Sequence, residues 1–269
     1  MSKKTILENP EMRVILAGKG DVGLIIGHEA LQLSGVEKPN VLIIASASNT
    51  QAKFDRYVGN SMDVFEKQLG AKTNTMHEFG QTPTIAEIED KIGSANVVWI
   101  PGGRAQHAKQ IFDETGIGAE LIKASKDTVL SGGSAGTMLL AEHGMSYSTP
   151  IGGPNEFIGF DGYPIASLTV SPHNDYVEPE DGNTEPRSEH FKDFIKKNGL
   201  YRPTPWIGID HEAGLSLTGD GFKVIANDVK NNSGVTAFRD SNTGIYEARF
   251  TPKSDYVPVA QLAALPKHH

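Results

Sequence analysis

One serine in the chain stands where its hydroxyl can act as a nucleophile. Ser134 is the centre of a G-x-S-x-G sequence, with Gly132 and Gly136 on either side. An apolar stretch, 128–130, precedes this sequence and an Ala/Met/Leu stretch, 135–140, follows it. A strand, a sharp turn and a helix in this order form a nucleophile elbow, in which side chains at the flanking glycines would collide with neighbouring backbone. The sequence therefore predicts acyl transfer at Ser134.

Acyl transfer needs hydrogen-bond donors for the oxyanion that forms at the attacked carbonyl. The backbone N–H of Ala135 lies at the start of the expected helix, where the helix dipole adds positive potential. Paired glycines, Gly102 and Gly103, follow another expected strand, 96–100, and let backbone N–H groups approach a ligand. We expect Ala135 and Gly103 to supply the oxyanion donors, with a plain turn at the paired glycines as the alternative.

A serine nucleophile also needs a base at hydrogen-bond distance, normally a histidine that is held by an acid. His173 comes just after an apolar strand, 167–171, and so lies at a carboxyl strand end, as Ser134 does. In a doubly wound sheet these strand ends share one crevice. We therefore predict that His173 is the base; the alternative is a loop histidine that binds nothing.

The elements that position these residues follow from the pattern of apolar residues. The first half of the chain alternates short apolar runs with longer amphipathic stretches, which is typical of a parallel sheet with crossover helices. Before the elbow, the expected strands are 12–17, 40–45, 72–77 and 96–100. The expected helices between them are 24–33, 51–69, 84–92, 105–112 and 119–125.

The second half of the chain has a different pattern of apolar and polar residues. Beyond 167–171 the sequence predicts a charged helix at 187–197 and a strand at 206–210. Alternating residues from 214 to 250, with turns at 219–221 and 231–234, predict antiparallel hairpins at the sheet edge. We expect one α/β domain over 1–269, with an N-terminal extension at 1–11 and a C-terminal tail at 251–269.

The turn after the first strand carries a second glycine pattern. Gly18, Gly20 and Gly23 match the dinucleotide-binding spacing G-x-G-x-x-G. The acidic residue expected at the end of the second strand is missing, because that strand ends in the sequence A-S-A-S at 45–48. We therefore favour a tight strand-to-helix turn over nucleotide binding.

Composition limits the chemistry and the partners of the chain. Its 269 residues contain no cysteine, which excludes disulfides, thiolate zinc sites and cysteine nucleophiles. The formal net charge of −8 argues against a nucleic-acid or anionic-membrane surface. No stretch approaches the ~20 apolar residues of a membrane span, and no signal-peptide run opens the sequence. We expect a cytoplasmic protein without cofactor or metal.

Four segments together resemble a known family: Gly102-Gly103, 132–136, 171–173 and 184–187. They are similar to the peptidase E group of aspartyl dipeptidases and to the related cyanophycinases, over most of the chain from the first strand to about Gly214. The resemblance implies a class I glutamine amidotransferase-like fold, a doubly wound and mostly parallel sheet with antiparallel strands toward the C-terminus. It also implies that the elbow serine is the nucleophile and that the strand-end histidine is the base.

Two arginines carry what the resemblance implies about the substrate. Arg187 matches the family's arginine that pairs with the acidic side chain of an N-terminal aspartate, and a guanidinium binds a carboxylate bidentately. A protein of charge −8 needs such a local cation for an acidic substrate; a solvated surface arginine is the alternative. Arg104 replaces the family's Asn or Asp after the paired glycines, so it either adds a second carboxylate contact or points away.

The acid of the catalytic group is missing from its expected place. The family's acid lies about fifteen residues after the serine, where this chain has no carboxylate between 146 and 150. Glu156 is our preferred substitute and Asp161 the second choice. Without either, a Ser–His dyad remains, at a cost in rate of up to ~10⁴.

Together with these residues, the resemblance implies a serine exopeptidase that hydrolyses short Asp-X peptides through an acyl-enzyme, with a homodimer left open. A cyanophycinase-like hydrolase of β-Asp-Arg units is the first alternative. A non-catalytic binding protein is the second, because of the missing acid and Arg104. An α/β-hydrolase esterase is the third; it needs a late histidine as base, and His211 is its one candidate.

Overall fold

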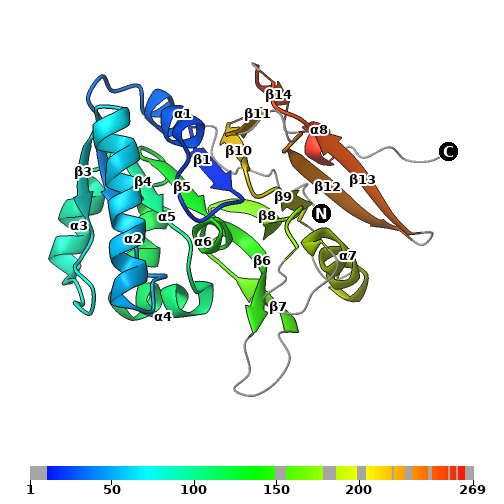
Figure 1. The fold of residues 1–269 in the computed structure, drawn as a ribbon, viewed down its shortest axis with the longest axis horizontal. Coiled ribbons are helices and arrows are strands. Elements are labelled where there is room, and N and C mark those ends of the chain that lie inside the picture. The colour runs from blue at the N-terminus through cyan, green and yellow to red at the C-terminus, as the bar shows by residue number, and fades with distance from the viewer. Residues whose placement is uncertain are drawn as a thin grey trace.

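The computed structural model describes residues 11–148, 156–177, 186–198, 204–219, 221–227, 232–241, 244–253, 255–258 and 260–263. These residues form an eight-stranded and a six-stranded β-sheet together with the helices around them (Figure 1). The expected N-terminal extension, except for Glu11, lies outside the described residues, and so does part of the expected tail.

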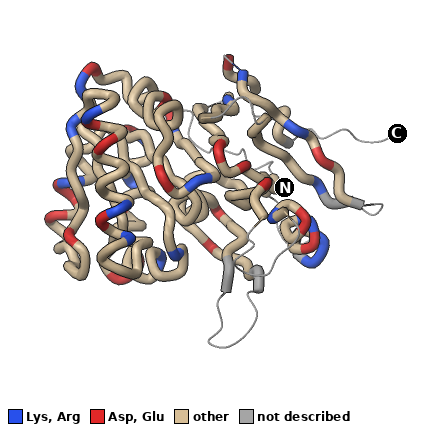
Figure 2. The backbone as a smooth tube through the Cα atoms, viewed as in Figure 1, with Lys and Arg blue, Asp and Glu red and all other residues tan. Residues whose placement is uncertain are grey.

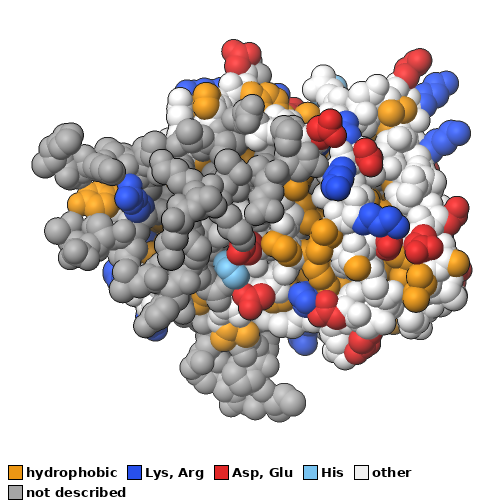
Figure 3. All heavy atoms as spheres, turned by 180° about the vertical axis from the view of Figure 1, so that it is seen from behind, with side chains coloured by type: hydrophobic (Ala, Val, Ile, Leu, Met, Phe, Trp, Pro, Cys, Tyr) orange, Lys and Arg blue, Asp and Glu red, His pale blue; other side chains and the backbone are white. Residues whose placement is uncertain are grey.

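Charged side chains of both signs are spread over the described surface. Positions of Lys and Arg are interspersed with positions of Asp and Glu along the backbone (Figure 2). The opposite face also mixes basic and acidic side chains, with hydrophobic side chains between them (Figure 3). Among the described residues, the helices are all too short or too polar to cross a membrane.

The first sheet contains the parallel strands that the first half of the sequence predicts. In sheet order these strands are β1 Arg13–Ala17, β5 Val129–Gly133, β4 Val97–Ile100, β2 Asn40–Ile43 and β3 Lys72–Thr75. The side chains of β4 and β5 are buried throughout, as expected for strands covered on both faces. β3 lies at the edge of the sheet, and its polar sequence K-T-N-T suits an edge strand.

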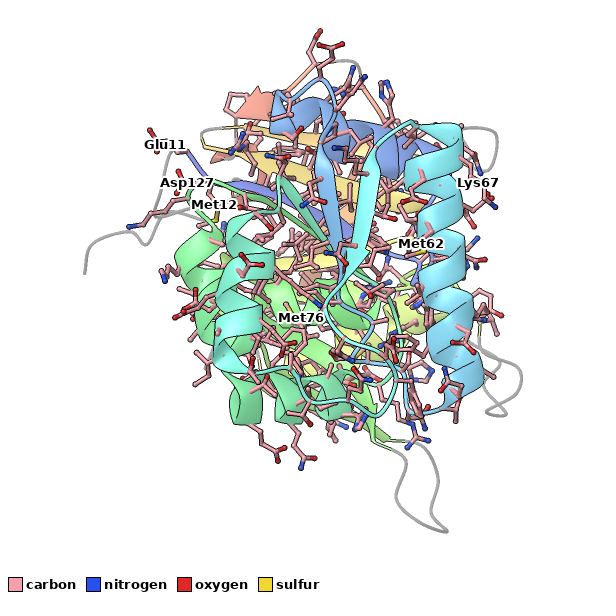
Figure 4. All side chains as sticks on the ribbon, turned by 90° about the vertical axis from the view of Figure 1, so that its left-hand side faces the viewer. Glu11, Met12, Met62, Lys67, Met76 and Asp127 are labelled. Atoms are coloured by element: carbon pink, nitrogen blue, oxygen red, sulfur yellow. The ribbon has the colours of Figure 1, made fainter. Side chains whose placement is uncertain are left out.

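Helices cover both faces of this sheet, and a view from its β3 edge shows α2 on one side and α3 on the other (Figure 4). One face packs against α1 Leu24–Ser34, α2 Gln51–Met62 and its π-helical continuation η1 Asp63–Gln68. The other face packs against α3 Ile85–Gly93, α4 Ala105–Thr115, α5 Ile117–Ala124 and α6 Ala135–Leu140. The single helix expected at 51–69 thus changes to π geometry near its end.

Antiparallel strands extend the first sheet beyond β1. They are β10 Ala213–Thr218, β11 Gly221–Ala226 and the short β14 Val257–Pro258. The hairpin expected around 219–221 joins β10 to β11 and is confirmed. The second expected hairpin is wrong, because β12 pairs with strands of the other sheet and not with β11.

The second sheet contains strands that the sequence pattern only partly predicts. Its order is β13 Gly244–Phe250, β12 Val235–Ser241, β9 Trp206–Ile209, β8 Ala166–Pro172, β6 Ala141–Ser148 and β7 Glu156–Asp161. β6, β8 and β9 are parallel, and the other pairs are antiparallel. α7 Arg187–Asn198 packs Phe191 against Trp206 and Phe238, and a short α8, Ala260–Ala263, lies near the end of the chain.

One hydrophobic core connects the two sheets. Leu130 of β5, Leu140 of α6, and Leu168 and Ile207 of the second sheet are fully buried members of the same cluster. α6 lies between the sheets, and β6 follows it without a loop (Figure 1). The helix that begins at the elbow therefore fixes the second sheet against the first.

Candidate active site

The turn at Ser134 has the strained backbone that the sequence predicts. β5 ends at Gly133, α6 begins at Ala135, and Ser134 between them has φ 52° and ψ −107°. Non-glycine residues rarely adopt such angles, and they keep them only where the surrounding structure enforces them. Here the Ser134 N–H donates to the carbonyl oxygen of Ala17 on β1 at 3.0 Å. The strand, sharp turn and helix of the expected elbow are therefore present.

The two glycines that flank the elbow are required by close backbone packing. A Cβ atom at Gly132 would lie 2.5 Å from the carbonyl carbon of Gly136. A Cβ atom at Gly136 would overlap the carbonyl oxygen of Ile100 on β4. The start of α6 is therefore in close backbone contact with both β5 and β4.

His173 meets the serine hydroxyl directly. Its Nε2 atom lies 2.8 Å from Oγ of Ser134. His173 follows β8, and its own φ of 57° is also in the left-handed region. The N–H of the next residue, Asn174, donates to the carbonyl of Ile209 at 2.9 Å and so ties this turn to the end of β9.

The strands that position Ser134 and His173 belong to different sheets, which differs from the expectation. The sequence analysis assumed one sheet whose strand ends share a crevice. Instead, β5 belongs to the first sheet and β8 to the second. The contact between Ser134 and His173 therefore crosses from one sheet to the other.

The surroundings of His173 keep its imidazole neutral at neutral pH. Burial of the ring, and then the positive charges of Arg187 and Lys19 nearby, hold the pKa of His173 well below its usual range. A neutral imidazole has a free lone pair on one nitrogen. His173 is thus in the protonation state that accepts a proton from a hydroxyl.

The other ring nitrogen of His173 contacts a second histidine. Nδ1 of His173 lies 2.7 Å from Nδ1 of His211, and the two ring centroids are 4.8 Å apart. The sequence analysis considered His211 only as the base of an esterase, yet the ring contacts His173 and not Ser134. The signal that singled out His173, a histidine just after an expected strand, also marks His211 after 206–210.

Of the two carboxylates proposed as the acid, one has a side chain outside the described residues and the other lies away from His173. The Glu156 side chain lies outside the described residues, and its backbone begins β7 opposite Ser148. The Asp161 carboxylate lies 2.8 Å from Nδ1 of His143 and is largely exposed. The Nδ1 side of His173, where an acid was expected, is occupied by the His211 ring.

The paired glycines lie beside Ser134. A Cβ atom at Gly102 would be 3.3 Å from the Cβ atom of Ser134. The Gly102 N–H donates to the Gly20 carbonyl at 2.9 Å, and the Arg104 N–H donates to the Ala47 carbonyl at 2.8 Å. Gly103 between them has φ 138° and is exposed. This loop thus leaves the Gly103 N–H as its available donor, next to the first N–H of α6 at Ala135.

The glycine-rich turn after β1 packs under this site. A Cβ atom at Gly20 would lie 2.9 Å from the Cα atom of Gly102, and one at Gly18 would overlap the carbonyl of Asp210. A Cβ atom at Gly23 would overlap the side chain of Asn227. Close packing therefore accounts for all three glycines of the G-x-G-x-x-G pattern, as the tight-turn interpretation expects.

Of the two arginines, Arg187 is buried and Arg104 is exposed. The Arg187 side chain, in the first turn of α7, donates from Nη2 to the carbonyl of Met145 at 2.8 Å. Its backbone N–H donates to Tyr176, which ties α7 to the turn after His173. This arginine is not the solvated surface residue of the alternative interpretation. Arg104 is the residue before α4, directly after Gly103.

The chain is similar to known proteins in sequence and in fold. A family model described as peptidase family S51 matches residues 18–225. A peptidase from an acI-B1 actinobacterium has a similar structure, with a TM-score of 0.67 and 15% identity over 93% of this chain and 98% of that one. A putative peptidase E protein from Listeria monocytogenes has a TM-score of 0.53 and 15% identity over 80% of this chain and 98% of that one. A search of curated proteins finds no match.

Proposed function

This chain belongs to peptidase family S51, and from that premise we propose that it is a serine exopeptidase that removes an N-terminal acidic residue from short peptides. The observation that carries the proposal is the 2.8 Å contact between Oγ of Ser134 and Nε2 of His173 at a strained elbow. The expected resemblance to peptidase E and the expected α/β fold class are confirmed by the family match and the structural neighbours.

In the proposed reaction, His173 moves protons while Ser134 carries the acyl group. Oγ of Ser134 attacks the carbonyl carbon after the N-terminal residue, and Nε2 of His173 takes the hydroxyl proton. The oxyanion accepts hydrogen bonds from the N–H groups of Gly103 and Ala135. His173 then gives its proton to the leaving amine. Water hydrolyses the acyl-enzyme by the same steps, and the proton returns to Ser134.

The preference for an acidic residue rests on Arg187. Its guanidinium is buried close enough to His173 to influence the charge of that ring. A carboxylate of the substrate would accept its hydrogen bonds in a bidentate arrangement. In a protein of charge −8, this local cation favours an acidic side chain in the site.

We propose a smaller role for Arg104, as a contact for a second carboxylate of the substrate. Its support is its place in the chain, one residue after the proposed oxyanion donor Gly103, and its exposure to solvent. The carboxylate of a dipeptide's C-terminal residue lies a few bonds beyond the scissile amide. An exposed guanidinium beside the oxyanion site is suited to reach it.

A panel of dipeptides tests the substrate assignment. Asp-X, Glu-X, Asn-X and β-Asp-Arg substrates are assayed with the wild type, Ser134→Ala and Arg187→Ala. We expect hydrolysis of Asp-X, none with Ser134→Ala, and loss of the preference for Asp-X over Asn-X with Arg187→Ala. Unchanged selectivity in the arginine variant would remove Arg187 from the site, and a wild type that prefers β-Asp-Arg would replace the Asp-X assignment.

A further inference from the structure

We propose that His211 is the positioning residue of the active site, a histidine that orients His173 where serine peptidases usually use a carboxylate. The inference deepens the proposed function and rests on it. It starts from the 2.7 Å contact between the two Nδ1 atoms.

The reaction requires one particular assignment of protons along this hydrogen-bond chain. The Ser134 hydroxyl can donate to Nε2 of His173 only if that nitrogen carries no proton, and a neutral imidazole then carries its proton on Nδ1. This Nδ1–H donates to Nδ1 of His211. His211 must therefore be the tautomer that carries its proton on Nε2. In this assignment each proton has one acceptor, and His173 is the tautomer that acts as a base.

The His211 ring is held in place from two directions. Its backbone N–H donates to the Asp175 carboxylate at 2.6 Å. Its ring stacks on Tyr176, with centroids 5.1 Å apart and an angle of 23° between the planes. Asp175 and Tyr176 belong to the turn that also contains His173. This one turn therefore holds both His173 and His211 in position.

The carboxylate of Glu212 acts on His173 only indirectly, through His211. Nε2 of His211 lies 3.9 Å from Oε1 of Glu212, within ion-pair range and beyond hydrogen-bond length. Glu212 in turn accepts a hydrogen bond from Lys19 at 3.0 Å. When His173 takes the serine proton and becomes charged, the His211 lone pair stabilises it first, and Glu212 acts through His211.

The direction of the pKa shift of His173 is consistent with this arrangement. Burial of the ring lowers the pKa most, and among the described residues the cations Arg187 and Lys19 lower it further. A direct carboxylate partner would act in the opposite direction. The base is therefore held in position and tautomer without the increase in basicity that an aspartate or glutamate supplies.

The test uses His211→Ala, with two rates measured separately. One is the rate at which a fluorophosphonate modifies Ser134, which needs no peptide substrate, and the other is kcat for Asp-X. We expect both rates to fall about 10²- to 10⁴-fold while KM changes little, as when the orienting member of a catalytic triad is removed. Imidazole in the buffer should restore part of both rates by filling the vacated site. A purely structural role for His211 predicts no such rescue.

A second variant keeps the test valid if His211→Ala fails to fold. His211→Glu places a carboxylate beside Nδ1 of His173, which should preserve modification of Ser134 and raise the pKa of His173. The acid limb of the pH–rate profile should then move to higher pH than in the wild type. His143→Ala is the matched control, because His143 is also partly buried and bonded through Nδ1, but to Asp161. It should leave both rates within about twofold.

The outcomes separate this inference from the substrate assignment. If no peptide is cleaved but modification of Ser134 slows in His211→Ala and recovers with imidazole, the substrate assignment fails and the role of His211 stands. If Ser134 is modified equally fast in the wild type and in folded His211→Ala, the role of His211 is refuted, whatever the peptides show. An acid limb that stays in place in His211→Glu refutes it as well.

Discussion

The imidazole of His173 lies 2.8 Å from the hydroxyl of Ser134, although the two residues follow strands of different sheets. Among the described residues only Asn232 shares their unusual backbone, a positive φ at a non-glycine position. Such strain costs on the order of 1–3 kcal/mol per residue and persists only where the surrounding structure enforces it. The fold thus stabilises an otherwise unfavourable backbone on both sides of a single hydrogen bond.

Modification of serine should be specific to Ser134. A second Ser–His contact exists between Ser46 and His77, at 2.7 Å, but no strained turn or helix start supports it. We expect a fluorophosphonate to add to Ser134 in the wild type and in Ser46→Ala, and not to Ser134→Ala. Intact-mass spectrometry followed by peptide mapping measures this. Modification at Ser46 would show that a Ser–His contact alone is enough.

Activity should persist into more acidic solution than an ordinary histidine base allows. Because the pKa of His173 lies well below its usual value of ~6.5, the ring stays neutral and basic as the pH falls through that value. The acid limb of kcat/KM should therefore lie below pH ~6.5, as a pH profile with Asp-X would show. A limb at or above that pH contradicts the prediction.

Removal of a neighbouring cation should move the acid limb of the pH–rate profile to higher pH. Arg187 is one of the groups that lower the pKa of His173, so Arg187→Gln should raise this pKa and move the limb to higher pH. The rate of Ser134 modification by a fluorophosphonate is the suitable measurement, because it does not depend on an acidic substrate. An acid limb at the same pH as in the wild type would mean that the Arg187 charge does not affect the pKa of the imidazole.

Arg104 should affect binding of a free C-terminal carboxylate. Arg104→Ala should raise KM for Asp-X about two- to fivefold, the size expected of an exposed ion pair, and leave kcat nearly unchanged. The same variant should show no change with the dipeptide amide, which lacks the carboxylate. Lys67→Ala removes an exposed cation from η1 and should leave KM unchanged for both substrates. Equal effects on the acid and the amide would contradict the assignment.

Two Gly→Ala substitutions in helices should have opposite effects on stability. Gly136→Ala places a Cβ against the carbonyl of Ile100 and should lower the free energy of unfolding by about 1–3 kcal/mol or more. Gly59→Ala in α2 has open space around the new atom and should raise it by about 0.5–1 kcal/mol. Urea unfolding of both variants measures the difference. A neutral Gly136→Ala would show that α6 can move away from β4.

Local sequence determined the elements, because the type of an element depends on the spacing of apolar residues within it. The parallel strands of the first sheet, their helices and the elbow all lie within a few residues of their expected positions. β6 was not predicted because its sequence, A-E-H-G-M-S-Y-S, has neither a regular alternation of apolar and polar residues nor an apolar run. β7 was likewise not predicted as a strand, and η1 was expected to be an ordinary helix.

Tertiary structure decided which of these elements meet. Sequence marked Ser134 and His173 separately, because each follows a strand, but it assigned both strands to one sheet. It did not reveal that His211 occupies the Nδ1 side of His173, nor that Arg187 is buried. These relationships depend on how strands far apart in the chain pair and pack. The free energy of that packing is the sum of many weak contacts, so no single position in the sequence reveals it.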